Sequence, residues 1–152
     1  MTTIKRTNSD DKDFQSLVRL LDADLKVRDG DEHAFFAQYN KIGSLKNVVV
    51  CYADDVAVGC GAFKEFDKTA VEIKRMFVQP ALRGKGIATS ILNDLELWAT
   101  ELNYKAFVLE IGKRQPEAIR LYTKAGYAII PNYGQYKNVE TSVCFRKNNF
   151  NK

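Results

Sequence analysis

A short basic loop with two glycines separates an apolar strand from an amphipathic helix between residues 72 and 102. The loop reads Arg83-Gly84-Lys85-Gly86. The first turn of a helix has backbone N–H groups without intrahelical partners, and this end of a helix carries partial positive charge. Glycine lets an anion approach such groups closely, and the two basic side chains add formal charge. The stretch therefore predicts a binding site for a phosphate or pyrophosphate at the start of the helix.

The strand before this loop has an interrupted alternation of apolar residues. Val71 and Ile73 begin an apolar face, two polar residues follow, and the apolar series resumes one position late at Met76. Such a one-residue slip is typical of a β-bulge, which bends a strand away from its neighbour. We therefore expect the strand at 70–78 to diverge from the next strand of its sheet.

Apolar spacing predicts the remaining elements. Strands are expected at 2–6, 47–52, 56–66, 70–78, 106–111, 127–130 and 141–146, and helices at 11–27, 31–39, 86–102 and 115–125. Gly59 and Gly61 lie within one of these strands and predict close packing or a bulge there. Gly126 is expected to stop the last helix.

Other interpretations of the basic loop remain open from the residues alone. A P-loop requires Gly-Lys-Ser/Thr after its first glycine, and this sequence is absent. A dinucleotide fingerprint requires Gly-x-Gly-x-x-Gly, whereas Gly84-x-Gly86-x-x-Thr89 lacks the third glycine. Glu110 nevertheless closes the next strand, where a ribose-binding carboxylate would be expected, so a dinucleotide site stays an alternative. A surface turn with basic side chains is the simplest interpretation.

Two motifs resemble the signatures of one protein family. Arg83-x-x-Gly86-x-Ala88 matches the pattern (Gln/Arg)-x-x-Gly-x-(Gly/Ala). Residues 115–127 read Gln-Pro-Glu-Ala-Ile-Arg-Leu-Tyr-Thr-Lys-Ala-Gly-Tyr and resemble a second signature. On these residues the chain resembles the GNAT superfamily of acyl-CoA-dependent N-acyltransferases, over residues 45–147. The resemblance implies an α/β (α+β) fold with a mixed, mostly antiparallel, twisted sheet of about seven strands, helices on both faces and a splayed, bulged central strand.

The resemblance also implies acetyl-CoA as a cosubstrate and assigns residues to it. Backbone N–H groups of the loop and helix start would hold the pyrophosphate, and the bulged strand would pair with the pantetheine. The implied cofactor-binding residues are Met76, Phe77, Val78, Arg83, Gly84, Lys85, Gly86, Ile87, Ala88, Thr89 and Gln115. Gln115 stands where many relatives carry asparagine, so its longer side chain departs from the family pattern.

Tyr122 and Glu72 are the catalytic residues that the resemblance implies. In relatives, a tyrosine at the position of Tyr122 protonates the leaving thiolate. The ordinary pKa of a phenol, about 10, is close enough to that of a thiol, about 8.5, for this proton transfer. In relatives, a glutamate at the position of Glu72 acts as a general base through water, so that a neutral amine attacks the thioester directly. From the residues alone, Tyr122 is also compatible with a core position, and Glu72 with an ion pair to Lys74 or another cation.

The resemblance implies N-acetyl transfer to a primary amine. Acidic residues between Asp22 and Glu32 and the aromatic loop at 133–136 favour a small-molecule or amino-acid-like acceptor, although a solvated acidic surface would look the same. A catalytically silent acetyl-CoA-binding or sensing module of the same fold is an alternative. A dinucleotide-binding oxidoreductase and an acyltransferase for longer acyl chains are two others.

Composition limits the remaining possibilities. The 152 residues predict a single domain over 1–152. The net charge of +4 is too small to indicate a nucleic-acid partner. No apolar stretch approaches a membrane span, so no membrane association is expected. Three cysteines without metal-ligand spacing favour a reducing, cytoplasmic location and no metal. By analogy with the family, a homodimer is also expected.

Overall fold

One mixed β-sheet runs through the computed structural model, which describes residues 1–29 and 45–149. Within these residues the sheet has 7 strands in the order β1-β2-β3-β4-β5-β7-β6. The strands are β1 (Thr2–Thr7), β2 (Asn47–Ala53), β3 (Val56–Glu65), β4 (Ala70–Val78), β5 (Ala106–Gly112), β6 (Ala128–Ile130) and β7 (Ser142–Asn148). The helices are α1 (Lys12–Asp29), α3 (Ile87–Glu101) and α4 (Pro116–Lys124), with short 3-10 turns η2 (Pro80–Leu82) and η3 (Gly134–Tyr136).

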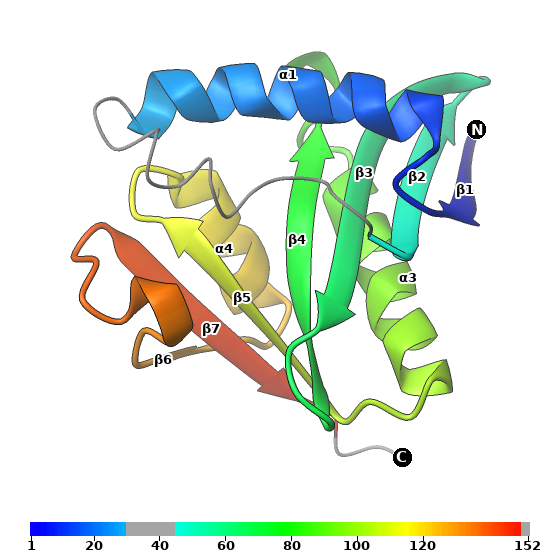
Figure 1. The fold of residues 1–152 in the computed structure, drawn as a ribbon. Coiled ribbons are helices and arrows are strands. Elements are labelled where there is room, and N and C mark those ends of the chain that lie inside the picture. The colour runs from blue at the N-terminus through cyan, green and yellow to red at the C-terminus, as the bar shows by residue number, and fades with distance from the viewer. Residues whose placement is uncertain (30–44, 150–152) are drawn as a thin grey trace.

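Neighbouring strands pair antiparallel except at the centre of the sheet. There β4 and β5 run parallel, and their pairing extends only from Ala70 opposite Ala106 to Glu72 opposite Val108. Beyond this point the two strands separate (Figure 1). The fold class and the splayed central strand expected from the sequence are therefore confirmed.

Helices cover both faces of the sheet (Figure 1). On one face, Phe14 and Leu17 of α1 are buried against Val48 and Phe77 of the sheet. On the other face, α3 and α4 pack on a larger core that includes Leu95 and Tyr122. The two cores lie on opposite faces of the sheet. The gap between β4 and β5 interrupts the sheet between them.

Most predicted elements lie close to the observed ones. Helix α1 begins one residue later than predicted and continues to Asp29, and α3 and α4 are each slightly shorter than predicted. Gly126 has a φ of 99°, a conformation that ends a helix readily, as expected from the sequence. The predicted helix at 31–39 lies outside the described residues. The aromatic loop at 133–136 contains the turn η3, which the sequence did not predict.

Candidate active site

A β-bulge at Arg75 separates β4 from β5. The register between β3 and β4 shifts between Cys60, which faces Phe77, and Ala62, which faces Lys74. Arg75 occupies the extra position with a φ of 60°, an unusual value for a residue with a side chain. The bulge predicted from the slipped alternation is confirmed, and it occurs just after β4 leaves its pairing with β5.

Gly61 faces the bulge and allows it to pack. A Cβ atom at this position would lie 2.5 Å from Met76 Sδ and 2.9 Å from Leu95 Cδ1. Met76 therefore uses the space that a side chain on β3 would fill. The close packing predicted from the glycines of β3 is confirmed here.

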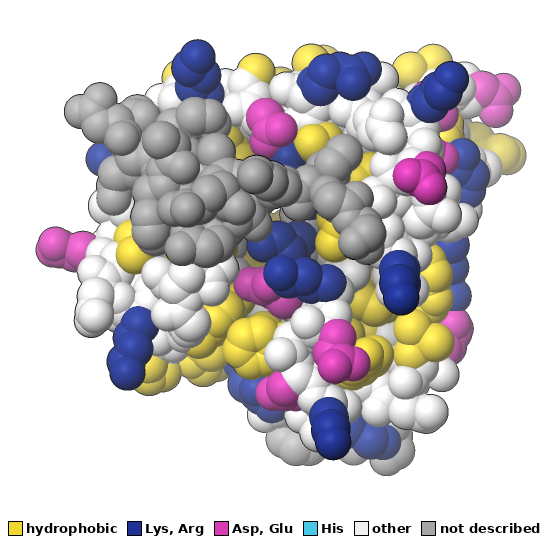
Figure 2. Space-filling view, viewed as in Figure 1, with side chains coloured by type: hydrophobic (Ala, Val, Ile, Leu, Met, Phe, Trp, Pro, Cys, Tyr) yellow, Lys and Arg dark blue, Asp and Glu magenta, His cyan; other side chains and the backbone are white. Residues whose placement is uncertain are grey.

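A cavity of about 350 Å³ occupies the space that the divergence of β4 and β5 opens. Its walls come from β4, from the glycine loop and start of α3, from the end of β5, and from α4 and α1. All the residues assigned above to cofactor binding or catalysis line it except Lys85. On the face of the molecule seen in Figure 2, basic and acidic side chains lie next to one another near the middle, with hydrophobic side chains around them.

The glycine loop presents an uncapped helix start to this cavity. Gly84 and Gly86 both have a φ of 82°, and no other atom lies within 4 Å of where their Cβ atoms would be. Gly86 is the N-cap of α3 and offers no side-chain hydrogen bond to the first turn. The first-turn N–H groups of α3 thus receive no side-chain hydrogen bond from the N-cap, which suits the binding of an anion there.

The backbone of Val78 faces the gap. The N–H of Gln79 donates to the carbonyl oxygen of Val58 at 2.9 Å, so the next pair along, Gly59 and Val78, is of the non-hydrogen-bonded kind. The N–H and C=O of Val78 consequently point away from β3 and toward the cavity. Arg83 Nε donates to this carbonyl at 2.9 Å.

Tyr122 reaches the cavity from α4. Its side chain is buried, and its ring makes an edge contact with Tyr127 at a centroid distance of 5.5 Å. Burial raises the pKa of the Tyr122 phenol above its ordinary value. The phenol is therefore a weaker acid than the ordinary phenol assumed from the sequence. It keeps its proton and can donate a hydrogen bond at any working pH.

Glu72 is buried on the opposite side of the gap and is held by several groups. Tyr133 donates a hydrogen bond of 2.7 Å to its Oε2 atom. The ammonium groups of Lys64 and Lys74 each lie 3.9 Å from its Oε1 atom. The ion pair with Lys74 considered from the sequence exists, and burial lowers the pKa of Lys74. Glu72 also lines the cavity, so its carboxylate can pair with lysine and still be reached from the cavity.

The acetyltransferase (GNAT) family model matches residues 14–127. This match covers most of the chain and includes both motifs. The chain belongs to the GNAT family. In the part of the chain that the structure describes, no helix is long and apolar enough to cross a membrane.

Several GNAT relatives are similar over part or all of the chain. An IAA acetyltransferase of Azospirillum brasilense is 37% identical over 89 residues, which are 58% of this chain and 58% of that protein. The N-acetyltransferase YsnE of Bacillus subtilis (strain 168) is 30% identical over 95 residues, or 61% of this chain and 63% of that protein. The chain therefore matches less than two thirds of the length of either relative.

Solved GNAT structures match the fold along nearly the whole chain. A Klebsiella pneumoniae protein assigned to the acyl-CoA N-acyltransferases is 27% identical, with a TM-score of 0.83 over 99% of both chains. The PaiA N-acetyltransferase of Thermoplasma acidophilum, solved with coenzyme A, is 14% identical, with a TM-score of 0.73 over 97% of this chain and 99% of that one. Antiparallel pairing of all neighbouring described strands except β4 and β5 differs from the doubly wound parallel sheet typical of dinucleotide-binding proteins.

Two further polar residues of the GNAT cavity were not assigned to acetyl-CoA or catalysis from the sequence. Glu110, considered there only for the dinucleotide alternative, lines the cavity from β5 and accepts a hydrogen bond of 2.6 Å from Ser142 Oγ. The side chain of Arg75 is buried, and its Nη2 lies 2.5 Å from Asp22 Oδ1. Its Nε finds no hydrogen-bond partner within residues 1–29 and 45–149. Only the slipped alternation around Arg75 hinted at a special role for this position.

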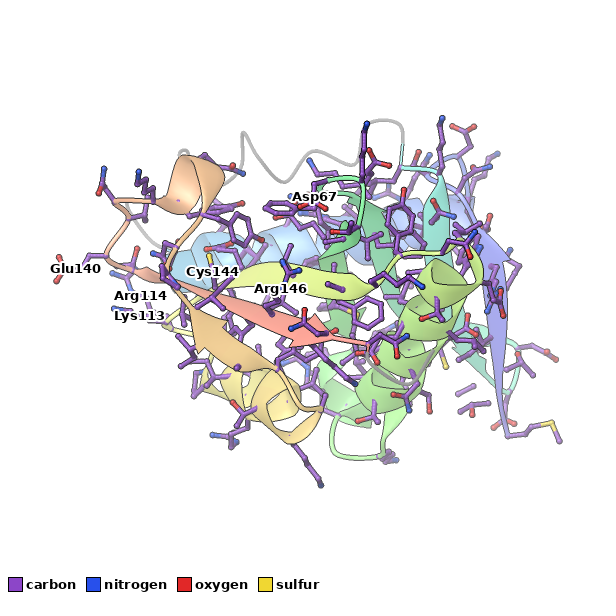
Figure 3. The ribbon with its side chains drawn as sticks, turned by 90° about the horizontal axis from the view of Figure 1, so that it is seen from below. Asp67, Lys113, Arg114, Glu140, Cys144 and Arg146 are labelled. Atoms are coloured by element: carbon purple, nitrogen blue, oxygen red, sulfur yellow. The ribbon has the colours of Figure 1, made fainter. Side chains whose placement is uncertain are left out.

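The cysteines are poor candidates for a covalent mechanism. All three are buried and free. Burial raises the pKa of Cys60 to about 12 and that of Cys144 to about 11, so neither is a thiolate near neutral pH. Cys144 lies on β7 beside the η3 segment (Figure 3). The geometry thus favours direct attack on the thioester.

Proposed function

We propose that this GNAT enzyme transfers an acetyl group from acetyl-CoA to the primary amine of a small, amino-acid-like acceptor. One observation carries the proposal. A single cavity, lined by the uncapped start of α3, Tyr122 and Glu72, lies in the gap between β4 and β5. An anion-binding helix start, a proton donor and a carboxylate therefore border one space.

The glycine loop and the edge of β4 would hold acetyl-CoA, which supplies a thioester when bound. N–H groups at Ile87, Ala88 and Thr89 would bind the pyrophosphate, with charge added by Arg83 and Lys85. Backbone groups of Met76 and Val78 would pair with the pantetheine in the manner of an added strand. Gln115 lines the cavity at the head of α4, where its side chain would meet the pantetheine.

Three groups of the protein would then carry the reaction. The N–H of Val78 would donate to the carbonyl oxygen of the thioester as its charge increases. Glu72 would take a proton from the acceptor ammonium through water, which leaves a neutral amine to form the new C–N bond. As the C–S bond breaks, Tyr122 would donate its proton to the leaving sulfur. The second proton of the attacking nitrogen would pass through water to the Tyr122 oxygen, so that the products are a neutral amide and a free thiol.

Charges of both signs in the cavity support an amino-acid-like acceptor. Asp24, Glu72 and Glu110 supply carboxylates, and Lys74 and Arg75 supply cations. A ligand with an ammonium and a carboxylate would complement such a mixed set, whereas a purely cationic or purely anionic ligand would meet like charges.

A thiol-release assay tests the proposed function. Acetyl-CoA is offered with amino acids and with the matching α-hydroxy acids, which lack only the amine. We expect thiol release with one or more amino acids and only background hydrolysis with the hydroxy acids. Equal release in both series would contradict amine acetylation.

A further inference from the structure

The segment between β6 and β7 forms a closed loop that carries an aromatic side chain to β4. Asn132 Nδ2 donates to the carbonyl oxygens of Val139 at 3.0 Å and Ser142 at 3.1 Å, which ties the two ends of the loop together. The ring of Tyr133 makes edge contacts with Phe66 at 4.9 Å and with Tyr136 at 6.0 Å between centroids. The loop therefore holds Tyr133 by both its backbone and its ring.

The hydroxyl group of Tyr133 contacts the buried carboxylate of Glu72 on β4. It donates to Glu72 Oε2 at 2.7 Å. Burial and the charge of Glu72 raise the pKa of Tyr133 well above its ordinary value. The phenol thus remains a hydrogen-bond donor throughout the pH range of an assay.

This contact divides the two oxygens of Glu72 between different partners. Oε2 is taken by Tyr133, whereas Oε1 lies 3.9 Å from the ammonium groups of Lys64 and Lys74, beyond hydrogen-bond distance. Among the described residues, Oε1 is consequently the Glu72 oxygen with capacity for a water molecule and its proton. Without Tyr133, the carboxylate would be free to turn and form a close ion pair with either lysine.

We infer that Tyr133 is a positioning residue that orients Glu72 for proton transfer from the acceptor amine. The inference rests on the proposed function, in which Glu72 is the general base. Tyr133 acts through Glu72 and makes no contact with the reacting atoms in this scheme. Its loss should lower kcat and leave acetyl-CoA affinity and the acceptor KM nearly unchanged, because binding groups are unaffected.

A double-mutant cycle tests the inference. Tyr133→Phe keeps the ring and removes only the hydroxyl, and Glu72→Gln removes the proton acceptor. Tyr104→Phe is a matched control, because Tyr104 donates a similar hydrogen bond of 2.6 Å to Glu65 at the surface. Rates are normalised to acetyl-CoA-binding sites counted by calorimetry, so that any unfolded fraction does not affect them.

We expect Tyr133→Phe to lower kcat about tenfold in the wild-type background and to have no further effect in the Glu72→Gln background. Tyr104→Phe should leave kcat unchanged. An unchanged kcat for Tyr133→Phe, or an equal loss in both backgrounds, would overturn the positioning role and leave Glu72 as the base. A wild-type kcat for Glu72→Gln would instead remove the base itself, and the inference with it.

Discussion

Arg83 joins the glycine loop to the exposed edge of β4 through a 2.9 Å hydrogen bond from its Nε to the carbonyl oxygen of Val78. The guanidinium also lies over the ring of Phe77, 5.7 Å from its centroid. This side chain therefore holds the two proposed cofactor-binding segments, the loop and the strand edge, in a fixed relation.

Replacing Arg83 with alanine should weaken acetyl-CoA binding. We expect Kd to rise about tenfold at low ionic strength, from lost charge and lost support of the loop. The difference from wild type should shrink at high salt, because salt screens attraction between the protein and the phosphates. Calorimetric titration measures this, with Lys124→Ala on the exposed end of α4 as a charge-matched control. An unchanged Kd for Arg83→Ala would show that the loop does not bind phosphate through this residue.

Replacing Tyr122 with phenylalanine should lower kcat about ten- to a hundredfold with little change in acetyl-CoA affinity. The pKa of the phenol is raised by burial, so the donor stays protonated as pH increases. Wild-type kcat should consequently show no loss attributable to Tyr122 below pH of about 10. Initial rates from pH 6 to 10 check both points. Full activity of Tyr122→Phe would show that Tyr122 serves only in the packing of the core.

Replacing Glu72 with glutamine should slow turnover about a hundredfold or more near neutral pH. The variant has no proton acceptor, so its rate should follow the fraction of acceptor that is already a free amine. Its kcat should therefore rise about tenfold per pH unit below the amine pKa, more steeply than wild type. If the pH–rate profile and kcat both match wild type, Glu72 serves only as a partner for the lysines.

The predicted elements show where sequence patterns determine structure. The slip after Ile73 predicted the bulge, because one inserted residue must move each later side chain to the other face. The positions of Gly84 and Gly86 predicted the anion site, because both adopt a φ of 82° that favours glycine. These features depend on short stretches of chain, so a local pattern is sufficient to predict them.

The polar partners of Glu72 and Arg75 depend instead on tertiary structure. Tyr133 follows Glu72 by 61 positions, and Asp22 precedes Arg75 by 53. No local spacing links residues so far apart. From the residues alone a core position for Tyr122 was one of two interpretations, and the packing of α4 on the sheet decides that its phenol is buried and its pKa raised.

Replacing Gly61 with alanine should destabilise the protein by about 1–3 kcal/mol, because the new Cβ would lie within 3.0 Å of Met76, Leu95 and Ile91. For a chain of this size, the melting temperature should fall by about 2–10 °C. We propose that residues 1–152 are one domain, so the loss should appear as a shift of a single transition. Equal melting temperatures for Gly61→Ala and wild type would contradict this packing.

The most direct test of the account locates the transferred acetyl group. The enzyme is mixed with an equimolar amount of acetyl-CoA carrying a ¹³C-labelled acetyl group and with an excess of amino acid, and the products of one turnover are analysed by mass spectrometry and NMR. We predict an N-acetylated amino acid bearing the label, with one free CoA per label transferred. Bound acetyl-CoA that persists with every amine tested, or a label found only in acetate, would contradict N-acetyl transfer and favour a protein of this fold that only binds the cofactor.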